Sequence, residues 1–231
     1  MIDVKRFRVI LMLVVALVLA FFGLATAQSS VVSLIAAKDN TIYAHNATLS
    51  NGAGAGMFAG ADGQNRIKRA LVYFAIADSI PANATVDSVR LTMSMSQTSG
   101  VGTAAISLHR VLADWGEGTS DATGIGGGGG GGGAPAMTGD AKWVHRFFNT
   151  NTWNTQGGDF SQTISASAQV GGFAFYTWGS IQQMVTDVQE WVKNIGEYEI
   201  LFDASKLTSG VYVYQINVNG FIDTKKLTLV K

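Results

Sequence analysis

Alternating hydrophobic and polar positions recur along the chain at the period of a β-strand. Val89, Leu91, Met93 and Met95 alternate with the polar residues between them, and Ile106 and Leu108 share one face of a later stretch. Residues 31–43 predict one or two strands. Residues 69–77 form a short unbroken apolar run, which predicts a strand buried on both faces. Turn-rich segments separate these runs, so we expect a mainly β fold, an antiparallel jelly-roll-like β-sandwich.

One segment follows the period of a helix instead. Ser180 and Gln183 have the spacing of a capping box at its start. Its apolar residues then recur three and four positions apart, at Ile181, Met184, Val185, Val188, Trp191 and Val192. The pattern predicts one amphipathic helix lying across the sandwich, with Trp191 as a core residue.

Near the C-terminus the period of two returns. Tyr212, Tyr214, Ile216 and Val218 alternate with smaller or polar residues, and Asn219-Gly220 follows them. An Asn-Gly pair between two alternating runs predicts a β-hairpin.

Eight consecutive glycines, residues 126–133, interrupt the middle of the chain. A phosphate-binding loop is excluded, because Gly-Lys-Ser/Thr does not follow the run. A linker between two domains is disfavoured, since strand-like and aromatic residues lie on both sides. The Gly-rich loop, residues 124–134, is therefore expected to be a solvated excursion from one domain.

The N-terminus has the pattern of a secretory signal peptide, residues 1–27. Basic residues precede an apolar run over residues 9–25, and Ala25 and Ala27 form the small-x-small cleavage pattern. An uncleaved membrane anchor is the alternative. Cleavage would remove three basic residues and one acidic residue, leaving a net charge of −2. Once processed, the chain is not expected to be a stable membrane protein.

Composition narrows the partners and the chemistry. The chain has no basic patch, so nucleic acid is not an expected partner. It has no cysteine, which excludes disulfides, thiolate catalysis and a lipidated N-terminal cysteine. Hydrophobic residues make up 47% of the chain and charged residues only 14%, a balance typical of an extracellular β protein. We expect an extracellular or outer cell-surface location, reached through the periplasm.

Catalytic patterns are weak. His45, His109 and His145 are scattered, without metal-ligand spacing. Asp114, Glu117 and Asp121 cluster, and a glycosidase could use paired carboxylates, but a polar turn accounts for the same residues. Similarly, Asp39, Asp62 and Asp159 could hold a structural calcium or simply set turns. We expect no enzymatic activity, no cofactor and no metal site.

Aromatic residues in polar, Gly-rich segments are the candidate binding residues, because sugar rings stack on aromatic faces. They are Trp115, Trp143, Trp153, Tyr176 and Trp178, with Glu117 as a candidate partner for sugar hydroxyls. Trp153, in the segment NTNTWNTQGGDF, is expected to be the most exposed. The alternative for Trp115, Trp143 and Trp178 is that they plug the sandwich core.

Several short blocks resemble a known family in order and spacing. They are DNTIY, RALVYF, SIPANATV, VRLTM, DWGEG, GDAKWVHRFF, GGDF, YTWGS and MVTDVQEWV, which are similar to the DNRLRE domain family over about residues 35–194. The resemblance implies a bacterial extracellular β-sandwich domain, residues 28–194, related to carbohydrate-binding modules. It also implies a binding or cell-surface role without a catalytic set.

The tail has a second resemblance. Residues 195–231 are similar to the last half of the C-terminal sorting domain of type IX secretion, with matching residues that include Gly210, Tyr212, Lys225, Lys226 and Lys231. This implies recognition by secretion machinery. Closing strands expected after the helix of a DNRLRE-type domain are missing, so we expect the tail to dock onto the sandwich or its helix.

Together these patterns predict a secreted or cell-surface, non-catalytic module that binds carbohydrate or acts in adhesion. The expected partner is a polysaccharide or a cell-surface glycan. A purely structural surface or matrix protein is the alternative, and a glycan-active enzyme is a weaker one.

Overall fold

The computed structural model describes residues 29–98, 102–125, 131–193, 210–218 and 221–229. The described part is built mainly of strands in antiparallel sheets, with a single α-helix, which confirms the predicted mainly β class. The expected signal peptide, including Ala25 and Ala27, lies outside the described residues, as does Lys231. No helix in the described ranges is long and apolar enough to cross a membrane.

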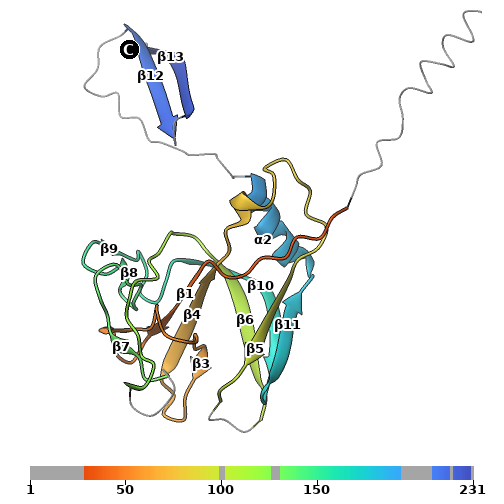
Figure 1. The fold of residues 1–231 in the computed structure, drawn as a ribbon, viewed down its shortest axis with the longest axis vertical. Coiled ribbons are helices and arrows are strands. Elements are labelled where there is room, and N and C mark those ends of the chain that lie inside the picture. The colour runs from red at the N-terminus through yellow and green to blue at the C-terminus, as the bar shows by residue number, and fades with distance from the viewer. Residues whose placement is uncertain (1–28, 99–101, 126–130, 194–209, 219–220, 230–231) are drawn as a thin grey trace, which may run out of the picture.

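A three-stranded sheet occupies one half of the body (Figure 1). It has the order β1 (Lys38–Tyr43), β4 (Ile67–Tyr73) and β3 (Gly60–Ala61). The predicted strand over residues 31–43 begins only at Lys38. Burial of residues 69–73 on both faces is wrong, because Leu71 alone among them is buried and the other four are half-buried. The rest of that apolar run turns into a short 3-10 helix, Ile76–Asp78, whose Ile76 is buried.

The other half contains two strand pairs that share one hydrophobic core (Figure 1). β5 (Arg90–Met95) pairs with β11 (Ala174–Gly179), and β6 (Ala104–Val111) pairs with β10 (Phe160–Val170). The half-buried residues of β5 alternate with its exposed residues, as the sequence predicts. Apolar side chains from all four strands meet in one cluster, which includes Leu91, Ile106, Leu108, Ala166 and Trp178.

Short strand pairs and loops complete the first half. β2 (Leu49–Ser50) pairs with β7 (Ala134–Pro135), and β8 (His145–Phe147) pairs with β9 (Asn151–Thr152). Fully buried polar side chains hold these loops together. The Asn40 side-chain oxygen accepts from Ser50 Oγ at 2.9 Å, and Asn40 Nδ2 donates to the Glu117 carbonyl at 2.7 Å. Irregular backbone can be buried here because side chains satisfy its hydrogen bonds.

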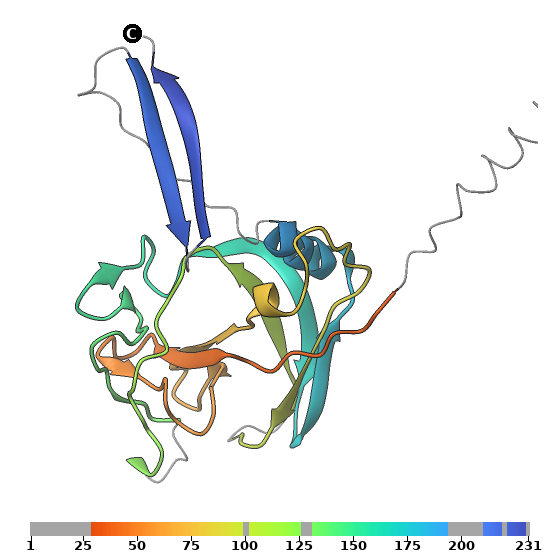
Figure 2. The same ribbon diagram turned by 45° about the horizontal axis from the view of Figure 1, so that its top comes forward.

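The helix α2 (Gln182–Lys193) covers one end of β10 (Figures 1 and 2). Met184 and Val192 are buried, as its apolar pattern predicts. Trp191 is not a core residue: it is 37% exposed, and its ring lies 5.4 Å from the Tyr73 ring, both measured centre to centre. The capping box is also wrong: the helix begins at Gln182, the Gln183 side chain donates to Asp187, and the Ser180 hydroxyl accepts from the Val89 amide.

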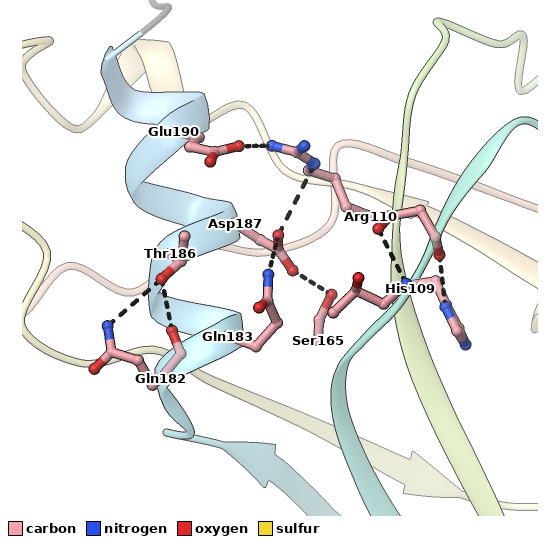
Figure 3. Close-up of polar contacts among 10 residues, drawn as sticks. His109, Arg110, Ser165, Gln182, Gln183, Thr186, Asp187 and Glu190 are labelled. Atoms are coloured by element: carbon pink, nitrogen blue, oxygen red, sulfur yellow. Dashed lines mark hydrogen bonds and ion pairs between the residues drawn. The ribbon is translucent and has the colours of Figure 1, made fainter.

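A polar cluster replaces Trp191 as the anchor of this helix (Figure 3). The buried Asp187 accepts from Ser165 Oγ of β10 at 2.5 Å and from Gln183 Nε2 at 3.0 Å. Arg110 of β6 forms an ion pair with Glu190 and lies 3.9 Å from an Asp187 oxygen. A buried carboxylate is tolerated because these partners compensate for its lost hydration.

The end of the glycine run packs against the body. Gly133 is buried with φ +77°, and a Cβ there would lie 2.9 Å from the Tyr43 ring and 3.0 Å from the Leu49 side chain. Ala134, directly after it, pairs with Ser50 in β7 and β2. The prediction of a solvated run up to Gly133 is therefore wrong at its last residue. Residues 126–130 lie outside the described ranges.

The predicted C-terminal hairpin is confirmed. β12 (Gly210–Val218) pairs with β13 (Phe221–Leu229) in antiparallel register, from Gly210 opposite Leu229 to Val218 opposite Phe221. Gly210 and Tyr212 of the expected sorting signal lie in β12, and Lys225 and Lys226 lie in β13. Within the described residues the hairpin forms its own two-stranded sheet and adds no strand to the sheets of the body.

Candidate functional site

A groove lies where the loop before β10 meets strands β4 and β6. Its volume is about 370 Å³, near the lower end of the range for small-molecule sites. Six of its ten lining residues are polar, namely Arg69, Asn154, Thr155, Gln156, Asp159 and Gln162. An apolar strip of Leu112, Ala113 and Phe160 lies beside them.

Arg69 comes from β4 and is fixed by two aromatic rings. Its guanidinium carbon lies 4.9 Å from the centroid of the Trp143 ring and 4.9 Å from that of the Phe160 ring. Its Nη1 donates to the Gly157 carbonyl at 2.7 Å. Burial lowers the pKa of Arg69, yet a guanidinium stays protonated in proteins. The groove therefore contains a rigid cationic donor.

Two glycines let the loop approach this arginine. Gly157 has φ +89° and Gly158 has φ +109°, a region that residues with a side chain rarely adopt. A Cβ at Gly157 would lie 2.5 Å from Arg69 Nη1 and 2.8 Å from the Trp143 ring. The Gly157 amide instead donates to the Trp143 carbonyl at 2.7 Å. Close packing of the loop on Arg69 and Trp143 thus requires glycine at this position.

Asp159 shapes the loop from inside. One of its carboxylate oxygens accepts from the Thr155 amide at 2.8 Å. The other accepts from the Asn154 amide at 3.0 Å and from Asn154 Nδ2 at 3.2 Å. Since both oxygens bond within the loop, Asp159 acts first as a turn former. The loop it fixes presents Asn154, Thr155 and Gln156 as exposed side chains.

The apolar strip is also fixed in place. The Leu112 amide, directly after β6, donates to the Asp159 carbonyl at 2.8 Å. The Leu112 side chain is nevertheless 58% exposed. Phe160 is half-buried, between Arg69 and the edge of the His109 ring. The groove thus sets an exposed apolar surface beside amide and hydroxyl groups.

The predicted aromatic residues do not line this groove. Trp153 is buried rather than exposed, with 5% of its surface accessible, and its Nε1 donates to the Lys142 carbonyl at 3.0 Å. It belongs to the core cluster that also contains Trp115, and Trp143 packs against that cluster. The sequence prediction for Trp153 was wrong because the loop turns its polar neighbours outward and the tryptophan inward.

Tyr176 and Trp178 lie in the other core cluster, so the structure does not bring them to Trp153. The Tyr176 hydroxyl donates to the Gly172 carbonyl and accepts from the Gly171 amide, each at 2.9 Å. Trp178 is buried, and its Nε1 donates to the Ile106 carbonyl. The position of Trp178 agrees with the core alternative.

The clustered carboxylates have separate partners. Glu117 accepts from the Asp39 amide at 2.8 Å, Asp114 pairs with Lys38 at 2.8 Å, and Asp121 accepts from the Thr123 amide. Burial, followed by the nearby Glu117 charge, raises the pKa of Asp39. Asp62 pairs with Arg66 and Lys68 in another turn. In the part of the chain that the structure describes, no group of three or more carboxylates or histidines could hold a metal ion.

Ser165 and Asp187 meet beneath the helix, whereas the His109 ring points away from both of them (Figure 3). Asp187 accepts directly from the serine, whereas His109 Nδ1 bonds the Ser161 carbonyl. A serine nucleophile needs the histidine between itself and the aspartate. These three residues do not make that arrangement, and the Ser165–Asp187 bond anchors the helix instead.

The segment that contains Trp153 contributes residues to the groove, but Trp153 itself does not line it. Sequence reasoning singled out residues 149–160 as exposed and polar, but took Trp153 as the binding residue. The groove residues Asn154, Gln156 and Gln162 are ordinary polar residues with no motif. Arg69 and Leu112 are distant in the sequence, so no local pattern connects them to the loop. The consecutive glycines before Asp159 were the one available signal of a close approach.

No protein-family model matches this sequence, and the searches of curated proteins and of solved structures found no match.

Proposed function

We propose that this protein is a secreted or cell-surface module that binds carbohydrate without cleaving it, and that the Arg69 groove is its binding site. The observation that carries the proposal is the exposed apolar strip beside outward-facing amides on a fixed loop. Sugars offer apolar C–H faces together with hydroxyls that both donate and accept. Amide side chains match those hydroxyls, because each amide also donates and accepts.

The rigidity of the groove supports binding. Asp159 fixes the loop backbone, and Arg69 is held between two rings. A site that is ordered before the ligand arrives loses less conformational entropy on binding. The resemblance of residues 35–194 to DNRLRE domains favours the same function.

Retention on polysaccharide tests the function. The protein would be run through native gels that contain soluble polysaccharides and mixed with insoluble ones. The double variant Gln156→Ala, Gln162→Ala should weaken retention about 5- to 100-fold, since each lost hydrogen bond is worth about 0.5–1.5 kcal/mol. Gln169→Ala, at an exposed position on β10 away from the groove, is the matched control.

Failure of the wild-type protein to bind any polysaccharide would reject this function and favour a structural surface or matrix protein. Equal retention of the double variant and the wild type would instead place binding outside the groove. Melting temperatures of all variants should agree, because the substituted glutamines are exposed.

Export is a separate part of the proposal. We propose that residues 1–27 are a cleaved signal peptide and that the tail is read by type IX secretion machinery. The intact mass of the exported protein should correspond to a chain beginning at Gln28. Recovery of the full-length chain in a membrane fraction would contradict cleavage.

A further inference from the structure

Resting on the proposed function, we propose that the groove selects glycans that carry N-acetyl groups. An acetamido substituent has three parts in a fixed order, which are a methyl group, a carbonyl acceptor and an N–H donor. The groove offers a partner for each part. A plain hydroxyl at the same sugar position would use only the polar partners.

The methyl group fits the exposed Leu112 side chain. This leucine is 58% exposed, and its backbone is fixed by the hydrogen bond to the Asp159 carbonyl. Ala113 and Phe160 extend the apolar strip within the same groove. Covering a fixed apolar side chain with a methyl group removes apolar surface from water on both partners, which favours binding.

The amide part fits the polar wall. Arg69 has only donors, and its side-chain hydrogen bond to the described part of the chain uses Nη1, so its other nitrogens can serve the acetamido carbonyl. The side-chain amides of Gln156 and Gln162 can accept from the acetamido N–H. Asp159 is a weaker acceptor for the ligand, because both of its oxygens already bond within the loop.

The charge of the groove favours a neutral ligand. Arg69 and Asp159 are the charged residues among those that line it, and their formal charges cancel. A carboxylated or sulfated sugar would gain attraction from Arg69 but lose it through repulsion from Asp159. An acetamido group carries a strong dipole without net charge, and it therefore fits this pair.

Two matched oligosaccharide series test the inference. Chito-oligosaccharides and cello-oligosaccharides have the same β-1,4 backbone and differ in the acetamido group at C2. Calorimetry with oligomers of equal length should give about tenfold tighter binding of the chito-oligosaccharide, which corresponds to one added hydrogen bond with methyl burial. A polyuronate serves as the acidic comparison.

The variant Leu112→Ser isolates the methyl contact. It should weaken chito-oligosaccharide binding by a larger factor than cello-oligosaccharide binding, because only the chito-oligosaccharide loses the methyl contact in addition to any contact with the sugar C–H face. Ile181→Ser is the control, because Ile181 is a comparably exposed apolar residue (47%) outside the groove. A thermal melt of each variant checks that the fold is retained.

The outcomes separate the two proposals. Equal affinity for both series, a preference for the polyuronate, or an equal loss of both ligands in Leu112→Ser would overturn the N-acetyl inference while glycan binding stands. Absence of binding to these ligands and to every polysaccharide in the wider panel would reject the proposed function itself.

Discussion

Replacing Trp153 should destabilise the fold rather than remove a surface contact. The side chain is 5% exposed and packs in the cluster with Ile42, Leu71 and Trp115. Truncation of a buried tryptophan to alanine costs about 3–5 kcal/mol. For a body of this size, each kcal/mol lowers the melting temperature by about 2–4 °C, so Trp153→Ala should melt about 6–20 °C lower.

A second variant separates packing from hydrogen bonding. Trp153→Phe keeps most of the ring but removes the Nε1 donor, which leaves the Lys142 carbonyl without that partner. The carbonyl keeps its bond from the His145 amide at 3.1 Å, so the lost hydrogen bond costs about 0.5–1.5 kcal/mol and this variant should be less destabilised than Trp153→Ala.

Urea denaturation followed by far-ultraviolet circular dichroism measures both effects. Thr152→Ala, at an exposed neighbouring position, is the control and should unfold at the wild-type midpoint. The reasoning fails if Trp153→Ala unfolds at the wild-type urea concentration. An unchanged midpoint combined with lost glycan retention would restore Trp153 as an exposed binding residue.

Three further substitutions test other parts of the structure. Gly157→Ala should destabilise the body by about 1–3 kcal/mol, because of backbone strain and a clash with Arg69. Gly158→Ala is the comparison, since a Cβ there would meet only a Phe160 carbon at 3.8 Å. In thermal melts, Gly158→Ala should lower the melting temperature less than Gly157→Ala. Gly133→Ala should lower the melting temperature, because the new Cβ would clash with the Tyr43 ring. Deleting residues 127–130 should hardly change the melting temperature, because loop entropy varies slowly with length. Equal melting temperatures of the two variants would contradict the packing of Gly133. The raised pKa of Asp39 means that its carboxylate costs stability at neutral pH, and that this cost disappears as the pH falls through the raised pKa toward the ordinary value of 3.8. Asp39→Asn should therefore melt higher than wild type at pH 7 and equal to it below pH 3.8, and a lower melting temperature at pH 7 would refute the assignment.

The sequence by itself determined the elements whose pattern is local. The alternation over Arg90–Met95, the apolar face of Gln182–Lys193 and the Asn-Gly hairpin each depend on neighbours within a few residues. Such periodicities show which face of an element is apolar before any tertiary contact forms. The mainly β class with one helix followed from them.

Only the tertiary structure decided which loop residues are buried. Trp153 and Asn154 are adjacent in a polar segment, yet the tryptophan enters the core and the asparagine lines the groove. The same holds for Trp191, which reaches Tyr73 across the surface because Asp187 and Arg110 position the helix. In irregular segments no period links sequence position to direction, so long-range contacts decide burial.

The candidate site also depends on a contact between residues far apart in the sequence. Arg69 donates to Gly157, 88 positions later in the chain, and Leu112 lies in the same groove. Sequence supplied the consecutive glycines that allow the approach, but not the arginine that they approach. The backbone freedom of glycine is a local property. Which residue the loop contacts depends instead on how strands that are distant in sequence come together.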